Sequence, residues 1–273
     1  MILKKKAARG DTLNENKANQ AIHKSCIQFL NGHCASSVVA PLGADVKEIL
    51  DALNIQRPGA LIMIAGATSE LSEEITSHLA QLCSLGIMPT VNKKNAMIID
   101  GGTQVGIIKL IGLSANEWGH RLNLLGITCA GLVTYPGGPS IKEELRDMSA
   151  PLDPNHSHFV LVQTEIWGRE TETMYALAQL ISKGVQVITL VINGGNIAKN
   201  EVLYSVRHGW PLLIIEGTGR LADEISTLWR EKPSSIKDEE MREIISKAPI
   251  SLFPLRGSPR DLEKELLHSL AKK

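Results

Sequence analysis

The chain has 273 residues, of which 43% are apolar and 21% are charged, and its 29 basic residues balance its 29 acidic ones. This length is enough for one large α/β domain or two smaller ones. The zero net charge gives no overall attraction to nucleic acid or to an anionic membrane. With three Phe, three Tyr and four Trp, the chain is also too poor in aromatic residues for a platform that stacks single-stranded nucleic acid.

Targeting and membrane signals are not recognised in the sequence. No apolar run reaches the roughly 18 residues of a membrane-spanning helix, and the lysines near the start are not followed by the apolar segment of a secretory signal. The four cysteines do not form a CxxC motif, which argues against a disulfide scaffold. We therefore expect a soluble, cytoplasmic protein without a nucleic-acid or membrane partner.

Residues 1–57 are expected to form an N-terminal extension. Its first 35 or so residues are polar and mixed, and we expect a poorly ordered start followed by a short helix at about residues 19–30. A strand or loop is expected at 36–41. The spacing of apolar residues predicts an amphipathic helix at 45–53.

Residues 58–230 alternate between apolar strands and helices. Strands are expected at 61–65, 96–99, 127–133, 159–162, 185–192 and 212–215. The helices are expected at 69–84 (capped by Ser69 and ended by Gly86), 104–113, 140–148, 170–182, 198–206 and 219–230. This alternation predicts an α/β fold: a Rossmann-like, doubly wound, mainly parallel sheet with helices on both faces.

Residues 231–273 are expected to form a helical C-terminal tail. A charged helix is expected at 238–246, a short apolar run follows at 250–253, and an amphipathic helix is expected at 260–270. We expect the tail to pack on the core; a helix that binds a partner is the alternative.

Glycine occurs in the turn after every expected strand, and three of these turns contain an adjacent pair. Ligands of open parallel sheets lie beyond the carboxyl ends of the strands, where glycine permits close approach and helix N-termini bind anions. The requirement of αβ units for tight turns is the alternative explanation. The turn GGTQVG differs from the dinucleotide GxGxxG motif and from the Walker loop. The residues predicted to bind ligand are Gly66, Ala67, Thr68, Gly101, Gly102, Thr103, Gly106, Tyr135, Gly137, Gly138, Thr164, Gly168, Arg169, Glu170, Gly194, Gly195, Gly217, Thr218, Gly219 and Arg220.

Several charged residues at the same edge are candidates for chemistry. Arg220 could clamp a phosphate or could pair with Asp223 on the same helix. Glu170 could act as a general acid or base or could favour the helix dipole. Asp100 is expected to be a turn residue. The remaining catalytic candidates are Glu165, Arg169 and Glu216.

Two groups of histidine and cysteine residues could suggest metal sites. His156 and His158 precede the fourth expected strand, so we place them at the amino end of the sheet, in a turn and capping role with imidazoles bonded to the backbone. His23, Cys26, His33 and Cys34 do not have a standard zinc spacing. No metal site is therefore expected. Cys83 and Cys129 lie in apolar stretches and are expected to be unreactive.

Four segments carry a family resemblance: GGTQVG, PLDPNHSHFVLV, ITLVINGG and PLLIIEGTGRLAD. In this order they resemble the SLOG-type domain of melastatin-type TRP channels and its prokaryotic relatives. VKEILDALNIQRPGALIMIAGA looks like the lead-in to the same domain and ISLFPLRGSPRDLEKELLHSL like the segment that closes it, so the similarity covers about residues 38–270. The resemblance implies a Rossmann-like sheet and a sensor of a nucleotide-derived signal, with ADP-ribose or a related NAD-derived nucleotide as the ligand. It also implies that Glu170 stands where SLOG enzymes place a glutamate at a helix start.

Three functions remain open from the sequence. The first is a ligand-binding sensor, for which a homo-oligomer or an effector protein is a possible partner. The second is a nucleotide N-glycosidase that uses Glu170 and Arg169, although the chain lacks the PGGxGT run of the base-releasing enzymes after the fourth strand and has YPGG one strand earlier. The third is a structural or interaction protein whose glycine turns serve packing only.

Overall fold

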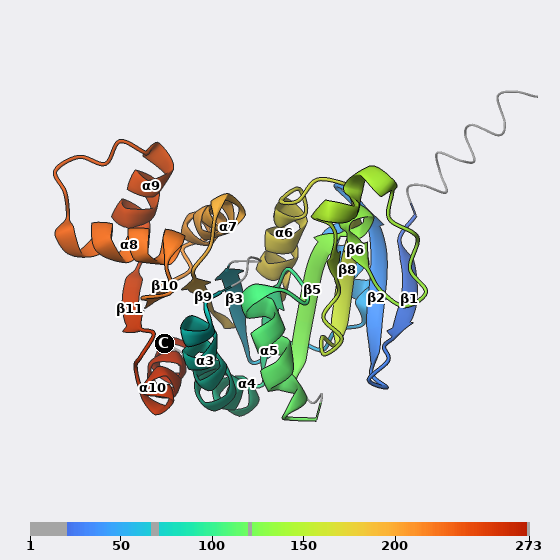
Figure 1. Cartoon of the computed structure of the whole chain (residues 1–273), viewed down its shortest axis with the longest axis horizontal. Helices are drawn as coiled ribbons and strands as arrows, with labels where there is room; N and C mark the ends of the chain where they lie inside the picture. The colour runs from blue at the N-terminus through green and yellow to red at the C-terminus, as the bar shows by residue number, and fades with distance from the viewer. Residues whose placement is uncertain (1–20, 67–70, 120–121, 272–273) are drawn as a thin grey trace, which may run out of the picture.

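A computed structural model of the chain describes residues 21–66, 71–119 and 122–271 (Figure 1). Within these residues the centre is a nine-stranded sheet in the order β1-β2-β8-β5-β4-β3-β9-β10-β11. Neighbouring strands pair in parallel except β1 and β2, which are antiparallel. The strands of this sheet are β1 (His23–Gln28), β2 (Cys34–Pro41), β3 (Ala60–Gly66), β4 (Ala96–Asp100), β5 (Asn123–Cys129), β8 (His158–Gln163), β9 (Gln186–Ile192), β10 (Leu212–Glu216) and β11 (Ile250–Pro254).

Helices cover both faces of the sheet, as Figure 1 shows. One face carries α3 (Glu73–Leu82), the π-helical turn η1 (Cys83–Ile87), α4 (Met88–Lys94), α5 (Gly106–Asn116) and α10 (Pro259–Ser269). The other carries α2 (Val46–Leu53), α6 (Thr171–Ile181), α7 (Asn196–Arg207), α8 (Arg220–Glu231) and α9 (Glu239–Lys247). The expected mainly parallel α/β fold is therefore confirmed.

The central strand β3 shows why a nearly continuous apolar run forms this sheet. Ile62 and Ile64 point to the face of α3 and α5, whereas Leu61 and Met63 point to the face of α2 and α6. All four side chains are at most 4% exposed. A parallel strand buried on both faces therefore needs apolar residues at consecutive positions rather than at alternate ones.

The N-terminal region differs from its prediction. The expected helix at 19–30 is instead strand β1, which forms a hairpin with β2; residues 19 and 20 lie outside the described part of the chain. A disulfide joins Cys26 and Cys34 across this hairpin. The prediction was wrong because antiparallel pairing with β2 outweighs the weak local preference of a polar segment.

The third strand is displaced toward the N-terminus. It is β5, which ends at Cys129, whereas the prediction placed it at 127–133. Residues 130–157 then leave the main sheet and include η2 (Ala130–Leu132), β6 (Val133–Thr134), the 3-10 helix η3 (Glu143–Met148) and β7 (Ala150–Pro151). The error arose because the sequence is apolar from 124 to 133, so apolarity alone does not show where pairing ends.

Gly86 does not end a helix, contrary to the prediction. Ser72 caps α3, and the chain continues through η1 and α4 as far as Lys94. A Cβ atom on Gly86 would lie 2.9 Å from the backbone oxygen of Pro259, so this glycine allows α10 to approach closely. The predicted cap, Ser69, lies outside the described residues.

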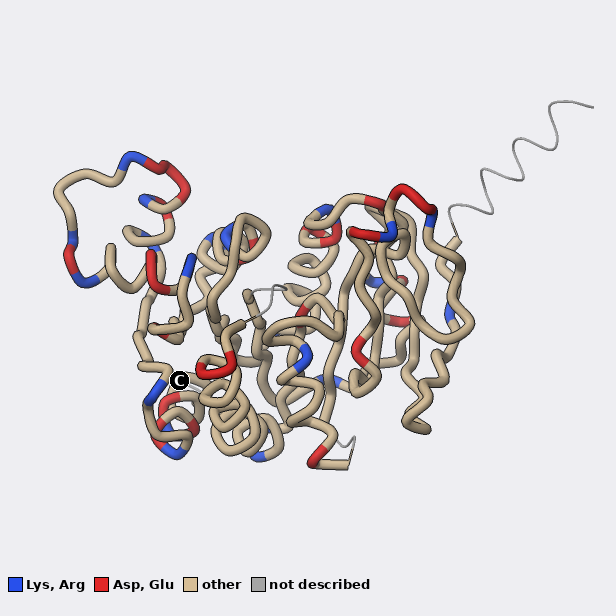
Figure 2. Tube along the Cα trace, in the orientation of Figure 1, with Lys and Arg blue, Asp and Glu red and all other residues tan. Residues whose placement is uncertain are grey.

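The C-terminal segment contributes to both the sheet and the core. Strand β11 pairs in parallel with β10. Leu262 and Leu266 of α10, with Leu270 at its C-cap, join the apolar cluster that also includes residues of α3 and α4. Figure 2 shows acidic and basic residues side by side around α9 and α10, where Lys264 pairs with Asp261. None of the helices in the described ranges is long and apolar enough to span a membrane.

Candidate functional site

A cavity of about 460 Å³ opens at the carboxyl ends of β3 and β4 and beside the starts of α5 and α7. Pockets for small molecules typically have volumes of about 300–1,000 Å³. Six of the residues predicted to bind ligand line it: Gly66, Gly101, Thr103, Glu170, Gly195 and Arg220. The edge of the sheet expected to bind ligand therefore does contain a cavity of suitable size.

One side of the cavity contains two helix N-termini and a guanidinium group. Val105, at the N-cap of α5, and Gly195, at the N-cap of α7, both line it, and no side chain in the described chain caps either helix. Free N–H groups and the helix dipole make such N-termini favourable for anions. The Arg220 guanidinium lies against Gly195, because a Cβ atom there would be 2.6 Å from Nη2. Arg220 also has a φ of 51°, in the left-handed region that non-glycine residues rarely adopt.

Two buried carboxylates line another part of the cavity. Glu170 precedes α6, is 6% exposed and accepts a hydrogen bond of 2.8 Å from the thiol of Cys129 at the end of β5. Burial raises the pKa of Glu170. Glu201, on α7, has a pKa raised well above its ordinary value by burial and then by the charges of Glu170 and Asp100. Both carboxyl groups are therefore easier to protonate than exposed glutamates.

Glu201 is the main lining residue that sequence reasoning missed. It lies in the helix predicted at 198–206, on the same buried side as Ala198, Val202 and Ser205. A signal was available, because a glutamate within the apolar side of a helix requires an explanation. That the side chain of Glu201 reaches the cavity follows only from where the fold places α7 relative to Glu170.

The rim of the cavity is apolar. Met148 and Ile197 line it and are 52% and 41% exposed. Trp167 lies beside them, with Nε1 donating a hydrogen bond of 2.8 Å to the carbonyl oxygen of Met148. Exposed apolar side chains that line a cavity are suited to contact with a flat ring of a ligand.

The turn between β10 and α8 is closed by its own side chains. The N–H groups of Gly217 and Gly219 donate to the carboxylate of Asp223, over 2.6 and 3.0 Å. The hydroxyl of Thr218 accepts the N–H of Asn193 from the neighbouring β9–α7 turn, at 2.8 Å. The contact between Thr218 and Asn193 holds the two turns together. Asp223 already gives the amides of Gly217 and Gly219 an anionic partner within the chain.

The other residues predicted to bind ligand lie elsewhere. Nine of them do not line the cavity in the described part of the structure. They lie in the segment that follows β5, in the β8–α6 turn and at three glycine positions: Tyr135, Gly137, Gly138, Thr164, Gly168, Arg169, Gly102, Gly106 and Gly194. Ala67 and Thr68 lie outside the described residues. Because β5 ends at Cys129, the YPGG stretch does not directly follow its carboxyl end.

Two further catalytic candidates form exposed ion pairs. Glu165 pairs with Lys142 at 2.7 Å, and Glu216 pairs with Arg230 at 2.8 Å. Neither glutamate lines the cavity in the described part of the structure. Within the same ranges, no three His, Cys, Asp or Glu side chains are arranged to hold a metal ion.

The segment around His156 lies against the glycine turns, contrary to the expectation that it is distant from them. The Nε2 atom of His156 is 2.9 Å from Asp100 Oδ1, and its Nδ1 is 3.2 Å from Asp153 Oδ1. The N–H of Asp153 donates to the carbonyl oxygen of Gly102 at 2.9 Å. The prediction missed the stagger of the strands, in which the start of β8 lies level with the end of β4.

The imidazole of His156 is bonded to two carboxylates rather than to the backbone, so that expectation was also wrong. All three side chains are fully buried. Burial opposes the charged imidazole, but Asp100 and Asp153 outweigh it and raise the pKa of His156 to about 10. An imidazolium between two carboxylates therefore joins the PLDPNHSH segment to the turn after β4.

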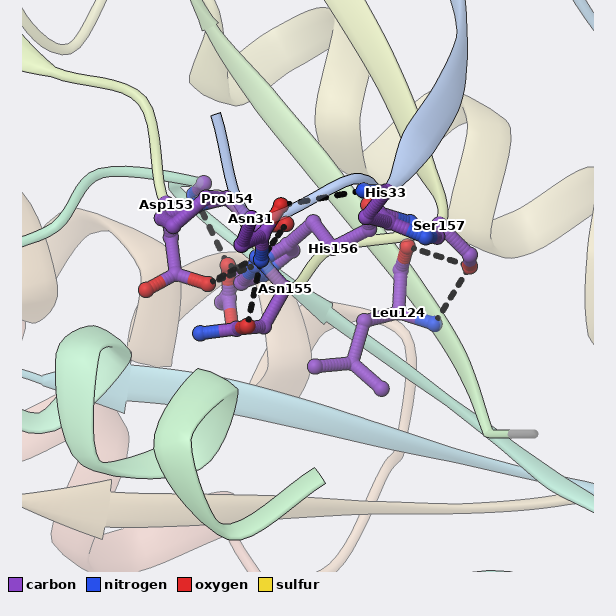
Figure 3. Close-up of polar contacts among 10 residues, drawn as sticks. Asn31, His33, Leu124, Asp153, Pro154, Asn155, His156 and Ser157 are labelled. Atoms are coloured by element: carbon purple, nitrogen blue, oxygen red, sulfur yellow. Dashed lines mark hydrogen bonds and ion pairs between the residues drawn. The ribbon is translucent and has the colours of Figure 1, made fainter. Parts of the chain in front are cut away.

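The hairpin of β1 and β2 supports this segment from outside, as Figure 3 shows. Nε2 of His33 is 2.9 Å from the carbonyl oxygen of His156, to which it donates, and Nδ2 of Asn31 donates to the carbonyl oxygen of Pro154 at 3.2 Å. The hydroxyl of Ser157 bonds to the backbone of Leu124 at the start of β5. The segment is therefore fixed on several sides.

The fold and this cavity define a class of protein: a doubly wound α/β domain with a small-molecule cavity at the carboxyl edge of its sheet. The chain belongs to the family described as SLOG in TRPM, prokaryote, which matches residues 59–263. Membership of this family supports the interpretation of the chain as a ligand-sensing or ligand-binding domain.

Cation channels are among the similar proteins. The chain is 26% identical over 205 residues to a transient receptor potential cation channel subfamily M member-like 2 of Nematostella vectensis, which covers 63% of this chain and 13% of the channel. It is 23% identical over 200 residues to subfamily M member 2 of Mus musculus, covering 62% and 13%, and 24% identical over 233 residues to member 7 of Homo sapiens, covering 72% and 12%. The chain thus matches about an eighth of the length of these relatives.

Proposed function

We propose that this domain is a sensor that binds a nucleotide-derived ligand, ADP-ribose or a related NAD-derived nucleotide, in the cavity at the carboxyl edge of the sheet. The observation that carries the proposal is the convergence on one cavity of Arg220 and of two helix N-termini that no side chain of the described residues caps. This arrangement offers N–H groups and a guanidinium to phosphate oxygens. The apolar rim offers a surface to the base.

The proposal can be tested by thermal unfolding with ADP-ribose, cyclic ADP-ribose, NAD, AMP, ATP and ribose 5-phosphate. A ligand that binds only the folded state adds about 2.7 kcal/mol of stability at 100 times its Kd, which gives a clear rise in Tm. We expect ADP-ribose or a related nucleotide to give the rise. If none of the six compounds changes the Tm at millimolar concentration, the proposal is wrong.

A nucleotide N-glycosidase is the second candidate, favoured by one observation. Glu170 lines the cavity with a pKa raised by burial, as is common for a group that donates a proton to a leaving group. Arg169, the partner expected from the sequence, is exposed and does not line the cavity in the described chain, whereas Glu201 does. Release of a free base from a nucleotide, lost in Glu170→Gln with binding retained, would favour this function over the sensor.

A further inference from the structure

We infer that the acidic part of the cavity, formed by Glu170, Glu201 and Thr103, is a subsite for the hydroxyl groups of a sugar and that it excludes phosphate. The inference rests on the proposed function and extends it, because it fixes which end of a phosphorylated ribose enters this part of the cavity. It also assigns a ligand-contacting role to Glu201.

The side-chain carboxylate of Glu201 accepts no hydrogen bond from the described residues. Its side chain lines the cavity and is 9% exposed, and no donor in the described residues bonds to its carboxylate. Ser205 on the same helix donates to the backbone oxygen of Glu201 and not to the side chain. Because a buried carboxylate without partners destabilises the folded state, its retention at a cavity indicates a partner from outside the chain.

Thr103 gives an independent indication from another element. It lies in the turn between β4 and α5, lines the same cavity and is 2% exposed. Its Oγ1 atom is buried without a hydrogen-bond partner in the described residues. A hydroxyl can donate to one ligand atom and accept from another. A buried hydroxyl without a partner on the β4–α5 turn and a carboxylate on α7 that accepts no hydrogen bond from the described residues therefore border one space.

The charge of the region decides which ligand group fits. Glu170 adjoins Glu201, and Asp100 lies near enough to affect it electrostatically. A phosphate placed here would be repelled by these acidic groups, whereas a sugar hydroxyl can donate to a carboxylate or accept from a protonated carboxyl group. The phosphate instead fits the side with the N-termini of α5 and α7 and with Arg220.

The first test needs only the wild-type chain. The affinities of ribose 5-phosphate, 2-deoxyribose 5-phosphate and inorganic phosphate are measured by calorimetry or by nuclear magnetic resonance titration, with ADP-ribose in parallel. A site built to bond a hydroxyl strongly disfavours an analogue that lacks it. We expect ribose 5-phosphate to bind about tenfold or more tightly than either of the other two compounds.

The second test changes Glu201. Glu201→Leu keeps a similar volume but removes the acceptor and the charge. We expect it to weaken ribose 5-phosphate about tenfold or more and to leave inorganic phosphate unchanged or more tightly bound, an opposite response that simple loss of structure would not give. Glu172→Leu, an exposed position on α6, is the matched control and should change neither affinity. Circular dichroism checks that both variants are folded.

The outcomes separate this inference from the proposed function. If ADP-ribose binds but ribose 5-phosphate binds no better than inorganic phosphate, or Glu201→Leu weakens both compounds equally, the sugar subsite is wrong and the proposed function stands. If neither ADP-ribose nor any other nucleotide of the thermal panel binds, both are wrong.

Discussion

Buried ionisable side chains occur in two neighbouring regions at the carboxyl edge of the sheet, and the two regions differ in the surroundings of these side chains. In the first, the imidazolium of His156 lies between Asp100 and Asp153, and the group is sealed from solvent. In the second, Glu170 and Glu201 lie near each other and face a cavity, with the thiol of Cys129 as a donor to Glu170. The two regions differ in access rather than in hydrogen bonding. Asp100 Oδ2 and Asp153 Oδ2 also lack a partner in the described residues, but these two side chains do not line the cavity, whereas Glu170 and Glu201 do.

Removal of the central charge of the first region should give the largest effect. His156→Ala leaves two buried carboxylates without a counter-charge, and breaking such a buried group costs about 3–5 kcal/mol. We expect a loss of this size in the free energy of unfolding, measured with urea. The control is His268→Ala, an exposed histidine on α10, which should change stability by less than about 0.5 kcal/mol. Equal losses in the two variants would contradict the account.

The same region predicts a loss of stability at alkaline pH. The pKa of His156 is about 10 in the folded chain and near its ordinary value of 6.5 when unfolded, so its stabilisation is complete below pH 6.5 and is lost as pH rises through 10. Between pH 7 and pH 9.5 the free energy of unfolding should fall by up to about 3 kcal/mol from this group. In urea titrations across this range, His156→Gln should show a distinctly smaller fall; parallel slopes would mean that the imidazole is not held charged.

In the second region, removal of the guanidinium should weaken ligand binding. Arg220→Ala removes the charged donor beside the N-terminus of α7 and should lower the affinity for ADP-ribose by about tenfold or more, because hydrogen bonds to charged groups contribute about 1.5–3 kcal/mol. Calorimetric titration gives the affinity. Arg230→Ala on the same helix, which only breaks the exposed pair with Glu216, is the control and should bind normally.

Glu201→Gln should give the smallest effect, a rise in the free energy of unfolding where His156→Ala gives a fall. Burial and then the neighbouring charges raise the pKa of Glu201, so its ionisation opposes folding once the pH exceeds its unfolded pKa of about 4.5. Glu201→Gln should therefore raise the free energy of unfolding at pH 7 by about 1 kcal/mol, and the gain should disappear at pH 4. Urea unfolding at both pH values measures it. A loss of stability at pH 7 would show that the carboxylate is satisfied within the chain.

The sequence predicts the repeating part of the fold well, because apolar strands and amphipathic helices are local patterns. The helix at 45–53 and the buried strand at 61–65, for example, correspond to α2 and β3. The hairpin strand β1 and the end of β5 at Cys129 depend on pairing with distant segments, which a local pattern does not contain.

The candidate site was predictable to a similar degree. The glycine turns point to the edge of the sheet at which the cavity lies, since the expected position of a ligand relative to strand ends follows from topology. Which turn residues face the cavity does not follow from the sequence: Asp223 already occupies the amides of Gly217 and Gly219. The stagger of β8 against β4 brings His156 to Asp100, although the two are 56 residues apart.

The central claim is that the cavity binds a ligand while the His156 region only supports it. Hydrogen–deuterium exchange with and without saturating ADP-ribose tests this claim most directly, because it reports on the backbone of both regions in one experiment. We predict slower exchange at the starts of α5 and α7, around residues 103–108 and 195–199, and little change in the buried segment 153–158. Unchanged exchange at both helix starts, or protection confined to the 153–158 segment, would contradict the claim.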